Sequence, residues 1–272
     1  MERMGVSMHL KDYIKLYMYM VKNNVMAQME FKANFISSII TEIAFLMSKA
    51  LYIIVIYSVG ISINGVSPHQ MLMFIGSFTV ITGIMDSVYY PNIASIPEYI
   101  RSGELDIYLT KPISTQFLAS FRKFNIGLGI PNVLAGVVMI VISWYLSGVP
   151  VTLLNIIGYI TFTIIGSILT YPLLFFPTIL AFWLVKTDSL YDLTFSSWDF
   201  NNMPMTIYNK VVQRIGIFIL PIFILTNFAP MFVFGMLPVI YGVFAFLAVP
   251  IFVGLVILFW NKAIKSYTSA SS

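Results

Sequence analysis

Residues 96–112 read IPEYIRSGELDIYLTKP and form the densest run of charge in a chain that otherwise avoids charge. The ionisable side chains of the run are Glu98, Arg101, Glu104, Asp106 and Lys111. The core of a bilayer does not accept such a run, because charged side chains are costly to place there. Long apolar segments lie on both sides of it. We therefore expect the run to lie in water, between two membrane-spanning segments.

Local signals within the run predict two short helices. Pro97 can open the first helix, because its fixed φ suits the first helical positions. Gly103 can end it, because helices often finish on a residue in the left-handed conformation. A second turn over residues 105–109 then stops at Lys111-Pro112, since proline disfavours α geometry in the residue before it. We call residues 91–123 the elbow and expect it to be a folded docking surface.

Composition places the whole chain in a membrane. The 272 residues are 59% hydrophobic and only 10% charged, with a mean hydropathy of +0.89. A soluble domain carries about 25% charged residues. The apolar segments are long enough to span as helices, which need about 20 residues each. The absence of cysteine excludes disulfides and thiolate metal sites. We therefore predict an all-α integral membrane protein.

Residues 1–32 are predicted to form a separate interfacial element. A helix from about residue 10 to residue 29 gathers its apolar side chains within one narrow arc. Those side chains are Leu10, Ile14, Tyr17, Val21 and Val25. Lysines lie at one edge of this helix, where they can face anionic lipid. We expect an amphipathic helix in the headgroup layer, with membrane lipid as its partner.

Residues 33–272 are predicted to form one domain of six transmembrane helices. The expected spans are residues 33–60, 70–90, 124–146, 152–185, 211–229 and 238–260. Prolines inside membrane helices are tolerated where neighbours satisfy the freed carbonyls. We expect kinks at Pro172, Pro177 and Pro221, and a short non-spanning dip around residues 230–238.

Basic residues predict the orientation, because cytoplasmic loops carry an excess of lysine and arginine. If both termini are cytoplasmic, every basic residue except Lys49 falls in a cytoplasmic segment or near a cytoplasmic span end, Lys210 and Arg214 included. The elbow is then also cytoplasmic. The positive-inside distribution of lysine and arginine thus accounts for the net charge of +4, which does not indicate a nucleic-acid partner.

Two charges inside the first span are functional candidates, because intramembrane charge is rare and costly. Glu42 and Lys49 are seven residues apart, so they share a helix face at a separation of about 10 Å along the axis. A direct ion pair is out of reach, and each must meet a polar group on another helix or a water-filled cavity. Ser38 lies on the same stripe. Either these residues line a translocation path or subunit interface, or they are paired for structural reasons.

Catalytic constellations are absent from the sequence. His9 and His69 fall on opposite sides of the membrane in this topology, so no histidine dyad or metal cluster can form. The chain has neither a Gly-x-Ser-x-Gly elbow nor a His-Glu-x-x-His motif. It also lacks the Gly-x-x-x-x-Gly-Lys-Ser/Thr phosphate loop, so it cannot bind ATP in that way. We expect no enzyme activity, no metal and no cofactor on this chain.

The run IRSGELDIYLTKP at residues 100–112 resembles the I-R-x-G-x-L-D-x-x-L-x-K-P signature of six-span permeases of bacterial type-2 ABC exporters. Residues 13–35 are similar to the basic, aromatic lead-in of that family. Residues 204–230 are similar to its Y-P-x-x-I-Y … R … P … F-x-P segment, and residues 260–272 to its Y-x-S-A-S ending. The chain departs from the family pattern at Met203, where tyrosine is usual.

The resemblance implies the type-2 ABC exporter permease fold in the bacterial cytoplasmic membrane. It also implies a partner ATP-binding subunit in two copies, which carries ATP and Mg, and a second permease that is identical or homologous. In that family the elbow acts as a coupling helix on the ATPase. By this resemblance the residues that make or shape the contact are Glu98, Arg101, Gly103, Glu104, Leu105, Asp106, Leu109, Lys111 and Pro112.

The sequence therefore predicts the permease subunit of an ATP-driven exporter for an amphipathic or hydrophobic cargo, such as a drug, a peptide or a lipid-like compound. The alternative is an ion-coupled secondary transporter that uses Glu42 and Lys49. That class usually shows internal repeats, and none is evident here. An intramembrane enzyme is disfavoured by the motif search, and a non-transporting scaffold remains open.

Overall fold

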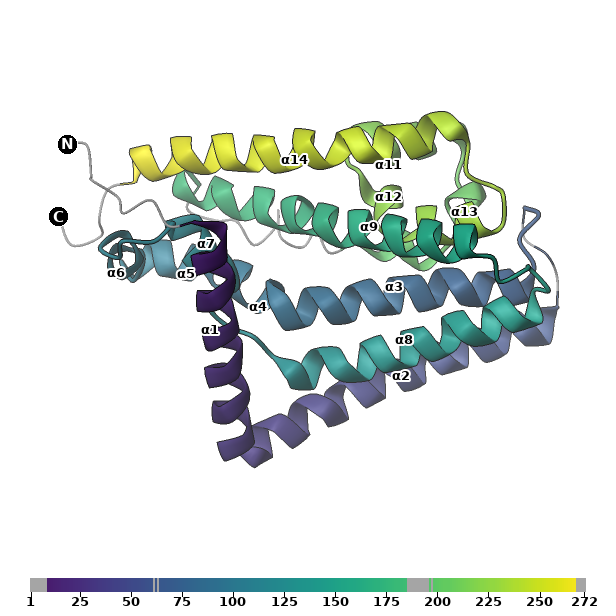
Figure 1. The fold of residues 1–272 in the computed structure, drawn as a ribbon, viewed down its shortest axis with the longest axis horizontal. Helices are drawn as coiled ribbons and strands as arrows, with labels where there is room; N and C mark the ends of the chain where they lie inside the picture. Colours follow the sequence, from purple (N-terminus) through teal and green to yellow (C-terminus); the bar gives the residue numbers. More distant parts are fainter. Residues whose placement is uncertain (1–8, 61, 63, 185–195, 197, 268–272) are drawn as a thin grey trace.

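The computed structural model describes residues 9–60, 62, 64–184, 196 and 198–267, which form a helical bundle with no β-strand among them (Figure 1). Five of its helices are long and apolar enough to cross a membrane. They are α2 (Lys32–Val59), α3 (Pro68–Val88), α8 (Ile126–Leu146), α9 (Leu153–Ile179, continued by the 3-10 turn η1, Leu180–Phe182) and α14 (Val239–Ser266). The predicted all-α membrane fold is confirmed.

Helix α3 is the most buried of these spans and packs most closely on α8. Glycines on the two helices make this approach possible. A Cβ atom at Gly76 would lie 2.9 Å from the Gly136 carbonyl oxygen, and one at Gly83 would lie 2.8 Å from the Gly129 carbonyl oxygen. Small residues of this kind let membrane helices approach backbone to backbone and gain van der Waals contact. The α3–α8 pair is therefore the rigid centre of the bundle.

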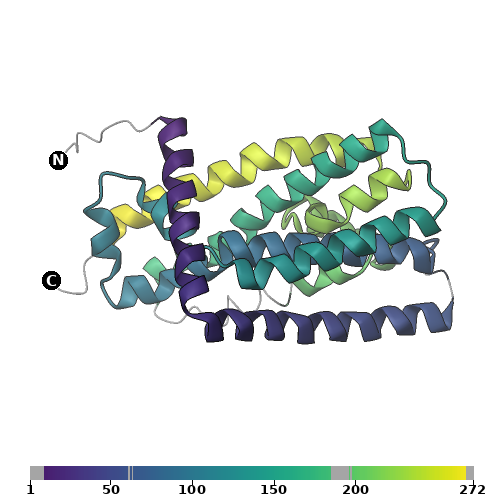
Figure 2. The ribbon, with the colours of Figure 1, turned by 60° about the horizontal axis from the view of Figure 1, so that its bottom comes forward.

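Helix α2 lies along one edge of the bundle, mainly against α8 (Figure 2). Its other face is apolar and exposed, with Ile40, Phe45, Met47, Leu51 and Ile54 each at least 60% exposed. An exposed apolar face of this size is suited to lipid or to another protein subunit.

Helix α1 (Leu10–Glu30) is present as predicted and runs crosswise to the long helices (Figures 1 and 2). Its Tyr13 and Tyr17 rings contact Phe117 and Phe121 of the elbow edge-on, at centroid distances of 4.9 and 6.1 Å. The Asn24 side chain donates a hydrogen bond to the backbone carbonyl of Arg122 (2.9 Å). The elbow thus has α1 on one side, and we call this end of the bundle the elbow end.

The predicted fifth span over residues 211–229 is wrong as a continuous helix. The segment instead contains α11 (Lys210–Phe218), α12 (Ile222–Thr226) and α13 (Phe228–Val233). Pro221 separates the first two, because it has no N–H with which to continue a helix. Both α12 and α13 pack on α9 and are buried. These two short helices enter the bundle without crossing it. The sequence analysis expects such a non-spanning segment around residues 230–238, whereas the structure has it over residues 222–233.

Phe182 and Thr206, which come before that segment, lie at opposite ends of the bundle. The Phe182 ring contacts Trp260 and Tyr267 at the elbow end of α14. The carbonyl of Thr206, in η3 (Met205–Ile207), accepts a hydrogen bond (3.0 Å) from the side chain of Asn64, in the loop between α2 and α3. That loop lies at the opposite end, which we call the far end (Figure 1).

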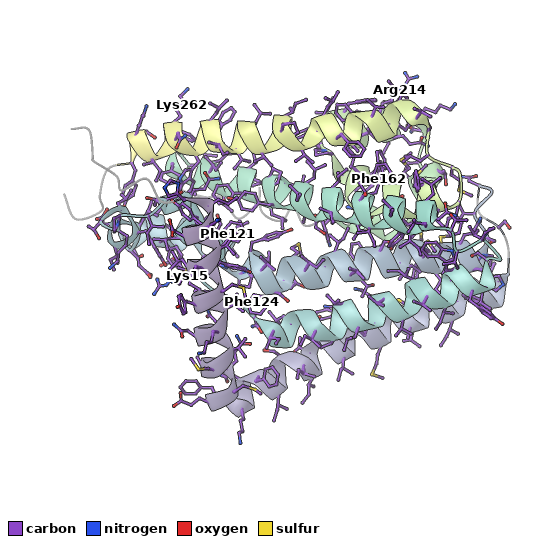
Figure 3. The ribbon with its side chains drawn as sticks, in the orientation of Figure 1. Lys15, Phe121, Phe124, Phe162, Arg214 and Lys262 are labelled. Carbon is purple, nitrogen blue, oxygen red and sulfur yellow. The ribbon has the colours of Figure 1, made fainter. Side chains whose placement is uncertain are left out.

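This path places Lys210 and Arg214 at the far end, so their predicted cytoplasmic position is wrong if the elbow is cytoplasmic. Figure 3 shows Arg214 at the end opposite to Lys262 and Lys15. The prediction failed because it assigned the crossing to residues 211–229, which start and finish at the far end. The remaining basic residues at the elbow end still outnumber these two.

Prolines within the spans have two different outcomes. Pro172 and Pro177 lie inside α9, which remains helical through Ile179. Pro221, by contrast, interrupts the chain and begins a new helix. Packing on neighbouring helices can satisfy carbonyls that a proline frees, which explains why α9 continues past two prolines.

Candidate functional site

The elbow contains four short helices, α4 (Tyr90–Ile93), α5 (Ile96–Arg101), α6 (Leu105–Leu109) and α7 (Thr115–Phe121). Pro97 lies in the first turn of α5, and Gly103 follows its last turn with φ at 75°. That φ belongs to the left-handed region, which glycine adopts without steric cost. The two helices predicted from these signals are confirmed, and α6 spans the predicted residues.

A small hydrophobic core holds the elbow together. Its buried members are Tyr99, Leu105, Tyr108 and Leu118. The Tyr99 and Tyr108 rings lie 5.3 Å apart, and the Arg122 guanidinium donates a 2.7 Å hydrogen bond to the Tyr108 hydroxyl. This core fixes α5, α6 and α7 relative to one another, so the elbow is a folded unit and not a loose loop.

Burial, with the neighbouring Tyr99 hydroxyl, raises the pKa of Tyr108 to about 12. The Tyr108 hydroxyl therefore stays protonated at neutral pH and can accept the hydrogen bond from Arg122 while keeping its own proton. The Arg122 guanidinium also lies 5.4 Å from the centroid of the Tyr108 ring. These contacts tie the end of α7 to α6.

The end of α14 closes the elbow core from another side. Tyr267 contacts Phe182 edge-on at a centroid distance of 5.9 Å. Burial and the nearby Asp106 carboxylate raise the pKa of Tyr267. Asp106 is half-buried and lies near Tyr267, so this predicted docking residue also connects α6 to the end of the last span.

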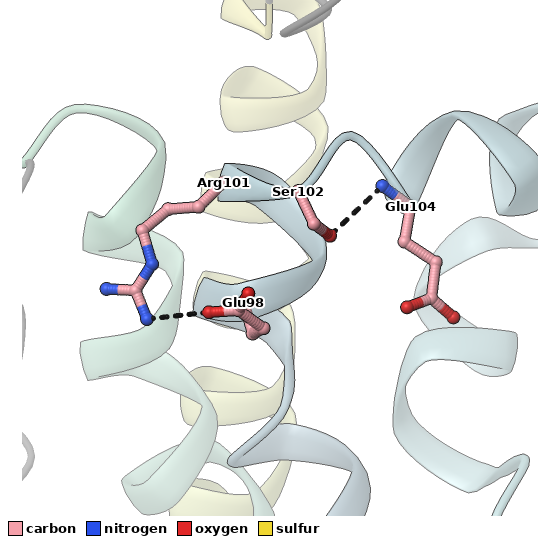
Figure 4. Close-up of polar contacts among 4 residues, drawn as sticks. All are labelled: Glu98, Arg101, Ser102 and Glu104. Carbon is pink, nitrogen blue, oxygen red and sulfur yellow. Dashed lines mark hydrogen bonds and ion pairs between the residues drawn. The ribbon is translucent and has the colours of Figure 1, made fainter.

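Most of the other predicted docking residues are exposed. Glu98 and Arg101 form an ion pair of 3.0 Å with side chains 65% and 51% exposed, and Glu104 begins the next turn beside Ser102 (Figure 4). Exposed pairs of this kind contribute only about 0–1 kcal/mol, so the pair can separate at low cost when a partner binds. Lys111 and Pro112 are exposed as well.

Ile107 is an exposed apolar residue that the sequence analysis missed. Its side chain is 57% exposed at the middle of α6, among the charged residues of the elbow. The motif treats this position as variable, so the only available signal was its apolar type within a charged run. An exposed apolar side chain surrounded by charge is suited to be the centre of a protein contact.

Leu105, by contrast, is fully buried and cannot touch a partner directly. Of the two contributions predicted for it, making the contact or shaping it, Leu105 can only shape the elbow. Half-buried Leu109 also contributes mainly to the shape of the elbow. The hydrophobic core requires Leu105, because it packs between Tyr99, Tyr108 and Leu118.

Leu105→Ala is expected to destabilise the elbow by about 2–5 kcal/mol, because it leaves a cavity in a small core. Hydrogen exchange should show faster exchange of the α5 and α6 amides. Ile107→Ala is the matched control, since it shortens an exposed side chain two residues away. Equal protection in both variants would contradict the assignment of Leu105 to the core.

Each intramembrane charge on α2 meets a polar group on another helix, as the sequence predicts. Buried Glu42 accepts a 2.5 Å hydrogen bond from the Asn132 side chain of α8. Lys49 donates to the Thr79 hydroxyl of α3 (3.4 Å) and lies 5.0 Å from the centroid of the Phe78 ring. The pair thus connects α2 to the rigid α3–α8 centre.

Two neighbours complete this intramembrane cluster. Ser38 is half-buried, and its hydroxyl donates to a carbonyl of its own helix (3.0 Å). Asp86, in the last turn of α3, caps neither end of that helix and lies close enough to interact electrostatically with Glu42 and Lys49. Its seven-residue spacing from Thr79 on one helix face could have indicated this placement.

Glu42→Ala is expected to lower stability by about 1–3 kcal/mol, because the buried Asn132 amide loses the shorter of its two hydrogen bonds and keeps only the 3.3 Å bond to the Leu128 carbonyl. Thermal unfolding in detergent measures the change. Glu42→Gln should recover most of the loss, since its amide oxygen can still accept from Asn132. Thr41→Ala, at the adjacent exposed position, should leave the midpoint unchanged. An Ala variant as stable as the wild type would show that this hydrogen bond contributes little.

Among the described residues, no group of three His, Cys, Asp or Glu side chains could hold a metal ion. Fold and site together define a multi-span α-helical membrane protein with a folded, charged elbow at one end. A family model described as ABC-2 family transporter protein matches residues 43–271. The chain belongs to this family of ABC-transporter permeases. Comparison with curated proteins and with solved structures gave no match.

Proposed function

We propose that this chain is the permease subunit of an ATP-driven exporter and that the elbow couples it to a separate ATP-binding subunit. The observation that carries the proposal is the elbow itself. It is folded around its own core, displays charged side chains with Ile107 among them, and contacts both α1 and the end of α14. A rigid element with these connections can pass movement of a partner to several spans at once.

The proposed assembly contains two copies of the ATP-binding subunit, with ATP and Mg bound there, and a second permease that is identical or homologous. The apolar outer face of α2 offers one surface for that second permease. In the proposed setting, the bacterial cytoplasmic membrane, the elbow and the ends of α1 and α14 beside it are cytoplasmic. ATP binding can shift the permease only through contacts that differ between its states, and the elbow provides such contacts.

The proposed cargo is an amphipathic or hydrophobic compound, in keeping with the apolar spans. Ser38, Glu42 and Lys49 could line its path or a subunit interface. The partners of Glu42 on α8 and of Lys49 on α3 support an interface or packing contribution more directly than an open path. Membership of the permease family disfavours the ion-coupled secondary transporter.

Copurification tests the proposal. The full chain, isolated from native membranes in mild detergent, is expected to bring an ATP-binding subunit with it, and the reconstituted complex should move cargo only with ATP and Mg. A chain that purifies without such a subunit, under conditions that keep a known ABC complex intact, would contradict the proposal.

A further inference from the structure

A cavity of about 630 Å³ lies between α3, α7, α9 and α14, at the elbow end of the spans. Its volume is within the range of ligand pockets, about 300–1,000 Å³. Apolar side chains from all four helices line it, among them Ile84, Val88, Phe117, Phe121, Ile168 and Ile257. None of the charged residues of the intramembrane cluster contributes to its walls, so it is a separate site.

The polar side chains on the cavity walls are already paired within the protein. The Tyr89 hydroxyl donates to the Ser167 carbonyl (3.1 Å), and the Ser167 hydroxyl donates to the Thr163 carbonyl (2.8 Å). Gln116 donates to the Tyr171 hydroxyl (3.0 Å). Buried polar groups that already have partners gain little from a polar ligand. The chemistry of the walls therefore favours a hydrocarbon occupant.

The rim of the cavity lies on the outer surface of the membrane-spanning helices, where lipid can reach it. Ile164, Ile168 and Ile257 line the cavity and are also exposed, at 54%, 42% and 44%. They belong to α9 and α14, two of the helices able to span the membrane. At the elbow end the lining includes Ser114, whose exposed backbone N–H donates to the Tyr13 hydroxyl of α1. The cavity thus opens along α9 and α14 and ends beside the elbow at Ser114.

We propose that this cavity binds one acyl chain of a phospholipid from the leaflet beside the elbow, with the headgroup at the Ser114 end. A chain in the cavity would gain the dispersion contacts that an empty apolar space lacks. The bound chain would also brace α7, because Phe117 and Phe121 form part of the wall and Leu118 belongs to the elbow core. The site therefore joins the lipid to the elbow, and it does not depend on the transport proposal.

Native mass spectrometry of the full chain tests this inference. After exhaustive detergent washing, the wild type should retain one phospholipid and should rebind 1-palmitoyl-2-oleoylphosphatidylglycerol when it is added back. Ser167→Phe, which places a ring in the cavity, should reduce rebinding at least tenfold. Val253→Phe, which fills the cavity from α14, should have the same effect if the first variant does not fold.

Matched controls place the same ring elsewhere on each helix. Ile157→Phe on α9 and Leu255→Phe on α14 alter exposed positions outside the cavity and should rebind lipid like the wild type. Glycerophosphoglycerol, the headgroup without chains, should not bind. The inference is overturned if the filled variants rebind lipid normally, if the controls lose it equally, or if the headgroup alone binds as well as the lipid.

Discussion

Ile107→Asp is expected to abolish copurification of the permease with its ATP-binding subunit. Ile107 is the large apolar side chain that α6 exposes, in the middle of the elbow. An apolar residue at the centre of an interface is desolvated on docking, and a carboxylate there would lose its water without a partner. Hot-spot residues, which cluster near the centre of an interface, cost at least about 2 kcal/mol when truncated, and we expect Ile107 to be one of them. That corresponds to a Kd roughly thirty-fold weaker.

The measurement is a pull-down from native membranes, followed by a binding titration with the purified ATP-binding subunit. Because Ile107 is exposed, the variant should insert and keep its hydrogen-exchange protection, unlike Leu105→Ala. Val211→Asp is the control, since it places the same charge at an exposed apolar position of α11, at the far end. Normal binding by Ile107→Asp would remove α6 from the docking surface.

Short-range signals explain why the elbow could be predicted from sequence. Proline at the start of α5 and glycine after its end act on the backbone directly, without help from tertiary contacts. The orientation of side chains could not be predicted equally well. A helix of five residues is too short for a clear apolar period, so Leu105 and Ile107 look alike in sequence. Only the packing with Leu118 and Tyr108 shows which of them is buried.

The fifth crossing shows where hydropathy fails. Residues 211–229 are apolar enough to span, but apolar composition does not distinguish a helix that crosses from one that enters and returns. Tertiary hydrogen bonds decide the path here. The Asn227 side chain accepts from the Met205 backbone N–H (2.6 Å), and the Thr226 hydroxyl donates to the Asn201 side chain (3.1 Å). These contacts hold the start of α13 against residues 201–205.

The charged residues of the intramembrane cluster could be predicted from the sequence, but their partners could not. Intramembrane charge identifies Glu42 and Lys49 as unusual, because such residues need polar partners. Their partners Asn132 and Thr79 lie on other helices, and a single sequence does not show which helices are neighbours. The glycines of α3 and α8 allow these two helices to pack closely together. Within an apolar span, however, a glycine does not indicate which helix it will contact.

Those glycines lead to the second large prediction, which concerns stability. Gly136→Val is expected to destabilise the protein by about 3 kcal/mol, at the upper end of the range for overpacking. A Cβ at Gly136 would lie 2.7 Å from the Gly76 carbonyl oxygen and 2.8 Å from the backbone nitrogen of Val80. Backbone atoms cannot rotate away as a side chain can, so α3 and α8 must separate.

Thermal unfolding of the purified chain should show a midpoint lower by roughly 10 °C, given about 2–4 °C per kcal/mol for a chain of this size. Gly254→Val on α14 is a close control, because a Cβ there meets nothing within 4 Å. It makes the same chemical change in another membrane-spanning helix. Because Glu42 reaches Asn132 on α8, separation of α3 from α8 would also disturb the contacts of α2. Equal midpoints for the two variants would mean that the close α3–α8 approach does not hold the bundle together.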